Sequence, residues 1–149
     1  MSLFLGASIH CIIPTSDVLL CSSLVLISQG KVNDAYNACS FALTKLGESI
    51  PDSMRPDTAK TMIKETLNLY EDDEWLKKRK MEDNTLRTIV KFYIKIATAA
   101  YFCKPKLLLV YFVCRSAQLN LRNGIFQHTP LATIHFASIA IKDENAAFV

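Results

Sequence analysis

Apolar residues recur at every third or fourth position over most of this 149-residue chain. Side chains at that spacing share one face of an α-helix, whereas a half-buried strand needs alternation at every second position. No segment alternates in that way between two turn signals. Four glycines and five prolines leave long stretches uninterrupted. The sequence therefore predicts an all-α fold, in which helices joined by short connections pack as antiparallel neighbours.

The breaks in this pattern predict where each helix begins and ends. Gly30, Gly47 and Gly124 follow apolar stretches, as residues after helix C-termini often do, and Pro105 and Pro130 suit a first helical turn. The expected helices are 17–29, 32–46, 57–70, 85–103, 105–123 and 129–142, with a short segment anchored by Trp75 and Leu76. We expect residues 1–16 to be an irregular N-terminal segment, 17–142 a helical-repeat domain, and 143–149 a tail.

The apolar stripes predict which helix faces are buried. In the second helix the shared face is Ala35, Cys39, Ala42, Leu43 and Leu46. The 85–103 helix has the clearest stripe: Leu86, Ile89, Val90, Tyr93, Ile96, Ala97 and Ala100. We expect its opposite face to be solvated, namely Arg87, Lys91, Lys95 and Thr98. The 105–123 helix is apolar nearly all round, which predicts neighbours on both sides. The expected stripe of the last helix is Leu131, Ile134, Ala137, Ser138 and Ile141.

The hairpin over residues 17–47 has the spacing of a tetratricopeptide repeat. Gly30 ends the first helix, Ala35 follows five residues later, and Ala42 follows after seven more, with Ser23 as a small residue in the first helix. Small side chains at these positions let two helices cross closely. Cys39 stands where the repeat usually has an aromatic residue, and Gly47 where it usually has proline. The expected architecture is a set of antiparallel helical hairpins stacked as a tetratricopeptide-like (TPR-like) α-solenoid fragment.

A longer series of motifs spans about residues 18–142. It consists of Gln29 to Pro51, Lys80-Met81-Glu82-Asp83, Ala99 to Leu107, Leu119 to Gly124, and Thr129-Pro130-Leu131-Ala132. In order and spacing this series resembles the helical-repeat region of predicted AAA-type ATPase and hybrid sensor histidine kinase multidomain signalling proteins. The resemblance implies an α-solenoid-like module in signal transduction. It brings no catalytic residues, because the catalytic motifs of that family lie in other domains.

Motifs for phosphate binding and catalysis are absent from the sequence. The four glycines are scattered and cannot form a phosphate loop, and neither a kinase motif set nor a Gly-x-Ser-x-Gly or His-Glu-x-x-His motif occurs. We therefore name no catalytic, cofactor-binding or metal-binding residue, and we expect neither an enzyme nor a cofactor. A small enzyme with an unrecognised site is the reading that the sequence favours least.

The five cysteines are odd in number, and no two have Cys-x-x-Cys spacing. They are Cys11, Cys21, Cys39, Cys103 and Cys114. Most of them fall within apolar helical patterns, so they are expected to be small buried residues in a reducing, cytoplasmic compartment rather than disulfides or zinc ligands. His128 and His135 do not favour a metal site either, because Pro130 breaks any helix between them.

Net charge is only +3, from 17 basic and 14 acidic residues, which gives no reason to expect a polyanionic partner. The basic run Lys77–Lys80 could contact nucleic acid, but as a helix end it also balances the acidic run Glu71–Glu74. The face with Lys91 and Lys95 could contact lipid head groups or simply be solvated. We expect protein partners, with no nucleic acid, no membrane and no small-molecule substrate.

The sequence thus predicts a non-catalytic α-helical repeat module for protein–protein interaction or signal transmission. Its terminal hairpins lack an obvious polar face, so we expect it to be a fragment of a larger signalling ATPase or sensor kinase, and to be marginally stable or self-associating alone. The alternative is a membrane-associated helical protein that uses residues 1–13 and 107–114. The apolar run 107–113 is much shorter than the ~20 residues that a membrane span needs.

Overall fold

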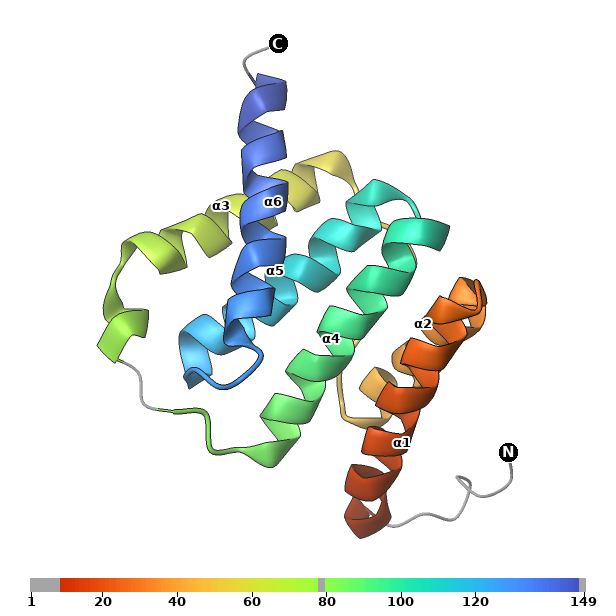
Figure 1. The fold of residues 1–149 in the computed structure, drawn as a ribbon. Coiled ribbons are helices and arrows are strands. Elements are labelled where there is room, and N and C mark those ends of the chain that lie inside the picture. Colours follow the sequence, from red (N-terminus) through yellow and green to blue (C-terminus); the bar gives the residue numbers. More distant parts are fainter. Residues whose placement is uncertain (1–8, 78–79, 148–149) are drawn as a thin grey trace.

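The computed structural model describes residues 9–77 and 80–147, and this part of the chain is all-α, as predicted (Figure 1). Its elements are α1 (Ile9–Ser28), α2 (Val32–Lys45), α3 (Pro56–Glu71), the 3₁₀ helix η2 (Glu74–Lys77), α4 (Asn84–Cys103), α5 (Lys106–Asn123) and α6 (Thr129–Ala147). The described residues form no strand. One isolated bridge joins Lys80 to Ile125 and ties the segment before α4 to the segment after α5.

Two antiparallel hairpins, α1–α2 and α4–α5, form the body of the molecule. The helix α4 packs against α2, α5 and α1, while α5 packs against α4, α3 and α6. The chain passes through α3 between the two hairpins, but α3 lies against α5 (Figure 1). As predicted, α5 has neighbours on both sides. The core therefore lies around α4 and α5, whose buried side chains include Phe92, Tyr93, Ile96 and Phe112.

The α1–α2 hairpin is held by the small residues that the sequence indicated. Ala35 and Cys39 are fully buried, and the Ser23 hydroxyl lies 3.4 Å from the Cys39 sulfur. The same hydroxyl donates a hydrogen bond of 2.8 Å to the Leu19 carbonyl, so its burial leaves no unpaired polar atom. The close helix crossing predicted from Ser23, Ala35 and Ala42 is confirmed, and Cys39, a departure from the repeat pattern, is buried in the same contact.

Gly30 closes this hairpin with a φ of +77°, in the left-handed region. The Lys31 amide, one residue later, donates to the Leu26 carbonyl at 2.8 Å. A side chain at position 30 would meet no atom within 4 Å, so the cost of Gly30→Ala is one of backbone conformation alone. We expect this substitution to lower the free energy of unfolding by about 1 kcal/mol, measured by urea denaturation. A gain in stability would contradict the left-handed geometry.

The helix α4 is more deeply enclosed than its sequence suggests. Asp83 caps it, accepting hydrogen bonds from the amides of Thr85 and Leu86 at 2.8 and 3.1 Å. Most of its predicted apolar stripe is buried. The opposite residues are half-buried rather than solvated: Arg87, Lys91, Lys95 and Thr98. The prediction of a solvated face was wrong, because α1 packs on α4 in addition to α2 and α5.

The two outer helices are longer than expected, so the predicted irregular segment 1–16 and tail 143–149 were too wide. The backbone of α1 is helical from Ile9 and continues through Pro14, which removes only one amide donor from the helix. The helix α6 continues to Ala147. Residues 1–8, 78–79 and 148–149, on which other parts of these predictions fall, lie outside the described residues.

The buried face of α6 was predicted wrongly. The buried residues are Ala132, Phe136 and Ala140, whereas the predicted stripe leaves Leu131, Ile134 and Ile141 exposed. The helix is apolar on both faces, so its periodicity did not distinguish them. The buried face is determined by packing on Tyr70 of α3, whose ring stacks on Phe136 at a centroid distance of 5.4 Å. Trp75 supports this contact, because its indole donates to the Tyr70 carbonyl at 3.0 Å.

Candidate functional site

A groove of about 880 Å³ lies where α3, α4, α5 and α6 approach one another. It is bounded by the first half of α3, the last turns of α4, the first half of α5 and the middle of α6. Its surface is mainly apolar, with contributions from Ala59, Ile63, Val110, Val113 and Ile139. The volume is in the range of pockets that bind ligands in proteins.

The rim of this groove is basic. Lys60, Lys104, Lys106 and Lys142 line it together with His135, and the described residues that line it include no aspartate or glutamate. The Lys104 ammonium lies 4.5 Å from the centre of the Tyr36 ring, so a cation–π contact with α2 already engages it. The rim therefore offers Lys60, Lys106 and Lys142 to an anionic ligand.

Two aromatic rings form one lip of the groove. Tyr101 and Phe102, at the end of α4, are 63% and 64% exposed, and their rings meet edge to face at 5.1 Å. Large exposed aromatic residues beside an apolar groove are typical of recognition surfaces. The amphipathic pattern of 85–103 did not distinguish these two residues. The helix ends directly after them, so no later turn shows which face they belong to.

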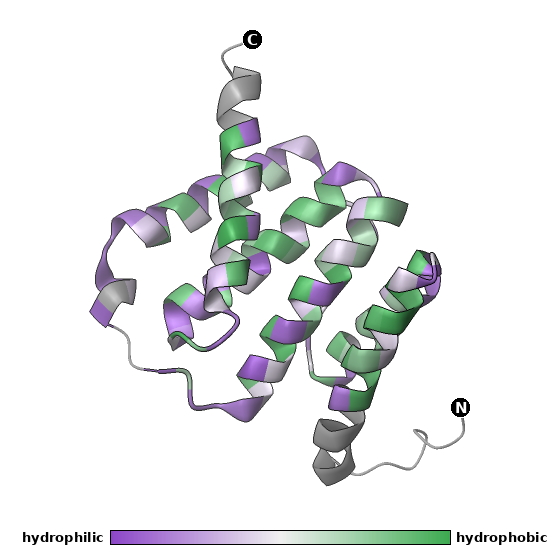
Figure 2. Ribbon diagram, viewed as in Figure 1, coloured by the Kyte–Doolittle hydropathy of each residue, from purple (hydrophilic) through white to green (hydrophobic). Residues whose placement is uncertain are grey.

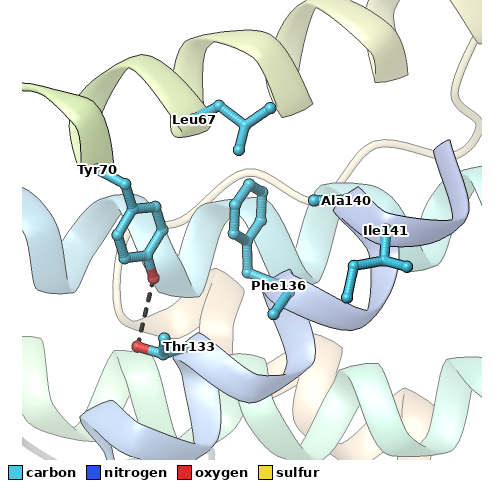
Figure 3. Close-up of a pocket in the computed structure, with 7 residues that line it drawn as sticks. Leu67, Tyr70, Thr133, Phe136, Ala140 and Ile141 are labelled. Carbon is cyan, nitrogen blue, oxygen red and sulfur yellow. Dashed lines mark hydrogen bonds between the residues drawn. The ribbon is translucent and has the colours of Figure 1, made fainter. Parts of the chain in front are cut away.

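The other side of α6 borders a smaller hollow of about 310 Å³ (Figure 3). Leu67 and Tyr70 of α3 face Phe136, Ala140 and Ile141 of α6 across it. The Tyr70 hydroxyl donates to the Thr133 hydroxyl at 3.3 Å, which is the polar contact at its edge. The middle of α6 thus has a hollow on each side and is held by its packing on α5 and by the contacts of Phe136 and Thr133 with Tyr70.

The histidines considered as a ligand pair have different surroundings. His135 lines the groove, where burial lowers the pKa of its imidazole. His128 lies beside Phe126 before α6, with their rings tilted at a centroid distance of 5.4 Å, and burial, together with the charges of Lys91 and Lys95, lowers its pKa. Among the residues whose side chains the structure describes, no group of three or more His, Cys, Asp or Glu residues is placed to hold a metal ion.

The buried thiols are not poised for nucleophilic chemistry. Burial raises the pKa of Cys39 to about 11, and it raises the pKa of Cys114 to about 11 as well. Both side chains are therefore protonated thiols at neutral pH, and the thiolate is the reactive form. Neither residue lines the groove.

A buried polar cluster joins the α2–α3 connection to the body. The Tyr93 hydroxyl donates to Glu48 Oε1 at 2.6 Å, and Arg115 Nε donates to the same oxygen at 3.1 Å. Burial alone would raise the pKa of Glu48, but the hydrogen bonds from Tyr93 and Arg115 lower it overall. Tyr111 fixes the next residue by donating to the Ser49 carbonyl at 2.8 Å. These residues hold the connection in place and lie outside the groove.

The remaining sequence hypotheses also have positions in the structure. In the basic run, Lys77 pairs with Glu74 at 3.3 Å on the surface, whereas residues 78 and 79 and the side chain of Leu76 lie outside the description. Lys91 and Lys95 are half-buried. None of the described helices is both long enough and apolar enough to cross a membrane.

Comparison with models of protein families, with curated proteins and with solved structures finds no match to this chain. The resemblance to signalling ATPases and sensor kinases therefore depends on its sequence motifs alone and stays a prediction.

Proposed function

We propose that this chain is a non-catalytic helical module for protein–protein interaction, and that its groove binds an amphipathic, acidic helix of a partner protein. One observation carries the proposal: an apolar groove whose rim has four lysines and, among its described lining residues, no carboxylate. An amphipathic helix places apolar anchors on one face and charged residues along the flanks. Its anchors would contact Ile63, Val113 and Ile139, and its carboxylates would face Lys60, Lys106 and Lys142.

The shape of the site supports a protein partner. The groove is partly open to solvent, and the exposed rings of Tyr101 and Phe102 add to its apolar surface. Aromatic residues in such positions contribute strongly to protein–protein recognition. Among the described lining residues there is one histidine and no carboxylate to act with it, so general acid–base chemistry has little support there.

The proposal extends to the architecture. The two hairpins α1–α2 and α4–α5 would be TPR-like units of an α-solenoid, with α3 as an inserted helix that packs on the second unit. The packing of α4 against both helices of the first hairpin supports this assignment. In a larger signalling protein such a module would transmit the binding event to its neighbours, as the motif resemblance implies.

The proposal predicts charge-selective binding of a helical probe. The probe is a fluorescein-labelled peptide of about 14 residues, with leucines three and four positions apart and glutamates on both flanks. We expect its anisotropy to rise with the protein and the affinity to fall as salt is added. The double variant Lys60→Glu/Lys142→Glu should weaken binding by about tenfold or more, because it replaces attraction at the rim by repulsion.

Two controls make the experiment decisive. Lys45→Glu changes an exposed lysine on α2, away from the groove, and should leave the affinity unchanged. A peptide with lysines in place of its glutamates should not bind. Equal binding of the acidic and basic peptides would refute the proposal. So would binding of phosphatidylserine vesicles through Lys60 and Lys142 without binding of the acidic peptide.

A further inference from the structure

From Val18 to Ser28 the outer face of α1 is largely apolar, and none of the described residues covers it. Val18, Leu24 and Val25 are 61%, 50% and 52% exposed, and Cys21 lies between them. The inner face of the same helix packs against the core through Leu19, Leu20, Leu26 and Ile27. In Figure 2 the coloured part of α1 is mainly apolar. An apolar helix face of this kind marks an interaction surface.

The charge pattern of α1 indicates what covers this face. From Val18 to Gly30 the sequence has no charged residue, so a second identical face can pack on it without burying an unpaired charge. Asp17 precedes this stretch and Lys31 follows it, and both are exposed. In an antiparallel pair the Asp17 of each copy would lie near the Lys31 of the other copy, with a separation along the helix axis of about one helical turn. A parallel pair would place like charges together.

The exposed residues also define a register. On a helix, Cys21 and Val25 are one turn apart. Viewed down the helix axis, the exposed side chains span an arc with Leu24 at one edge and Ser22 at the other, and Cys21 and Val25 lie in its middle. A two-fold axis between them brings Cys21 of one copy against Val25 of the other. The small side chain of Cys21 at this centre allows the two helices to approach closely.

We propose that this chain forms an antiparallel homodimer through the outer face of α1, with Cys21 of each copy against Val25 of the other. The interface lies on the first hairpin, and the groove lies among α3, α4, α5 and α6. The dimer is therefore independent of the function proposed for the groove, and either can fail without the other.

Sedimentation of the full chain over a range of concentrations tests the association. We expect a monomer–dimer equilibrium, and we expect Val25→Glu to weaken it by more than about tenfold, because an unpaired charge would be buried twice. Helix content from circular dichroism should be unchanged, since Val25 is exposed in the single chain. Phe41→Glu, at an exposed apolar position on α2, is the matched control and should leave the dimer intact.

Val25→Cys tests the register. Mild oxidation by copper-phenanthroline should convert this variant into a disulfide-linked dimer, because its new thiol lies against Cys21 of the other copy. The unaltered chain should form no covalent dimer under the same conditions. Efficient Cys21 cross-linking in the unaltered chain would show a parallel pair and overturn the proposal. A monomer at all concentrations would overturn it too. So would loss of association in Ile134→Glu but not in Val25→Glu, which would place the contact on α6.

Discussion

Replacing Phe112 by alanine should remove about 3–5 kcal/mol from the free energy of unfolding. Phe112 is fully buried in the middle of α5. Its ring lies 5.9 Å from that of Tyr36 on α2, and 6.3 Å from that of Tyr93 on α4. One truncation therefore loosens the contacts of three helices at once. Since domains of this size are stable by only about 5–15 kcal/mol, a large fraction of the variant should be unfolded near physiological temperature.

Urea denaturation followed by circular dichroism measures this loss. Phe102→Ala is the matched control, because it removes the same side chain from a position that is 64% exposed. We expect its stability to stay within about 0.5 kcal/mol of the unaltered chain. The same variant should bind the acidic peptide less tightly if the aromatic lip takes part in recognition. Equal destabilisation by the two substitutions would contradict the central position of α5.

Replacing Glu48 by glutamine should cost about 1–3 kcal/mol at neutral pH. The substitution removes the charge that pairs with Arg115 at 3.1 Å and weakens the acceptor for the Tyr93 hydroxyl. Both partners are anchored in the two central helices, so the α2–α3 connection loses its main polar attachment. Urea midpoints of the two proteins give the difference in stability.

The cost of this substitution should depend on pH. The pKa of Glu48 is lowered in the folded chain, so the unfolded chain binds more protons at acid pH. The carboxylate therefore adds stability above the ordinary value of 4.5, and this contribution is lost as the pH falls through the lower folded pKa. The difference between the unaltered chain and Glu48→Gln should shrink over that acid range. A difference that stays constant from neutral to acid pH would show that the charge is not responsible.

Local signals in the sequence predicted a good part of the fold. The buried face of α2 followed from its spacing, and Asp83, which caps α4, is of a residue type that often stands at helix N-termini. These features depend on neighbours within one or two turns, which periodicity and capping rules describe well. The central position of α5 followed in the same way, from a helix that is apolar on all sides.

The features that were missed depend on contacts between distant parts of the chain. Glu48 meets residues that are 45 and 67 positions away, and no local pattern marks such a partner. The groove combines Lys60 with Lys106 and Lys142, which come from three different helices. Both faces of α6 are apolar, and the stacking of Phe136 on Tyr70 determines which of them is buried. Tertiary packing alone places these residues together.

The position of α3 has a consequence for the order in which the chain acquires its structure. During synthesis α3 leaves the ribosome before α5, against which it packs. The Thr66 hydroxyl accepts a hydrogen bond of 2.9 Å from the Gln118 side chain, and this bond can form only after Gln118, 52 residues later, has been made. The α1–α2 hairpin, by contrast, closes between consecutive helices. In pulse-labelling during refolding, the amides of α3 should gain protection later than those of α2, although α3 comes between the two hairpins in the sequence.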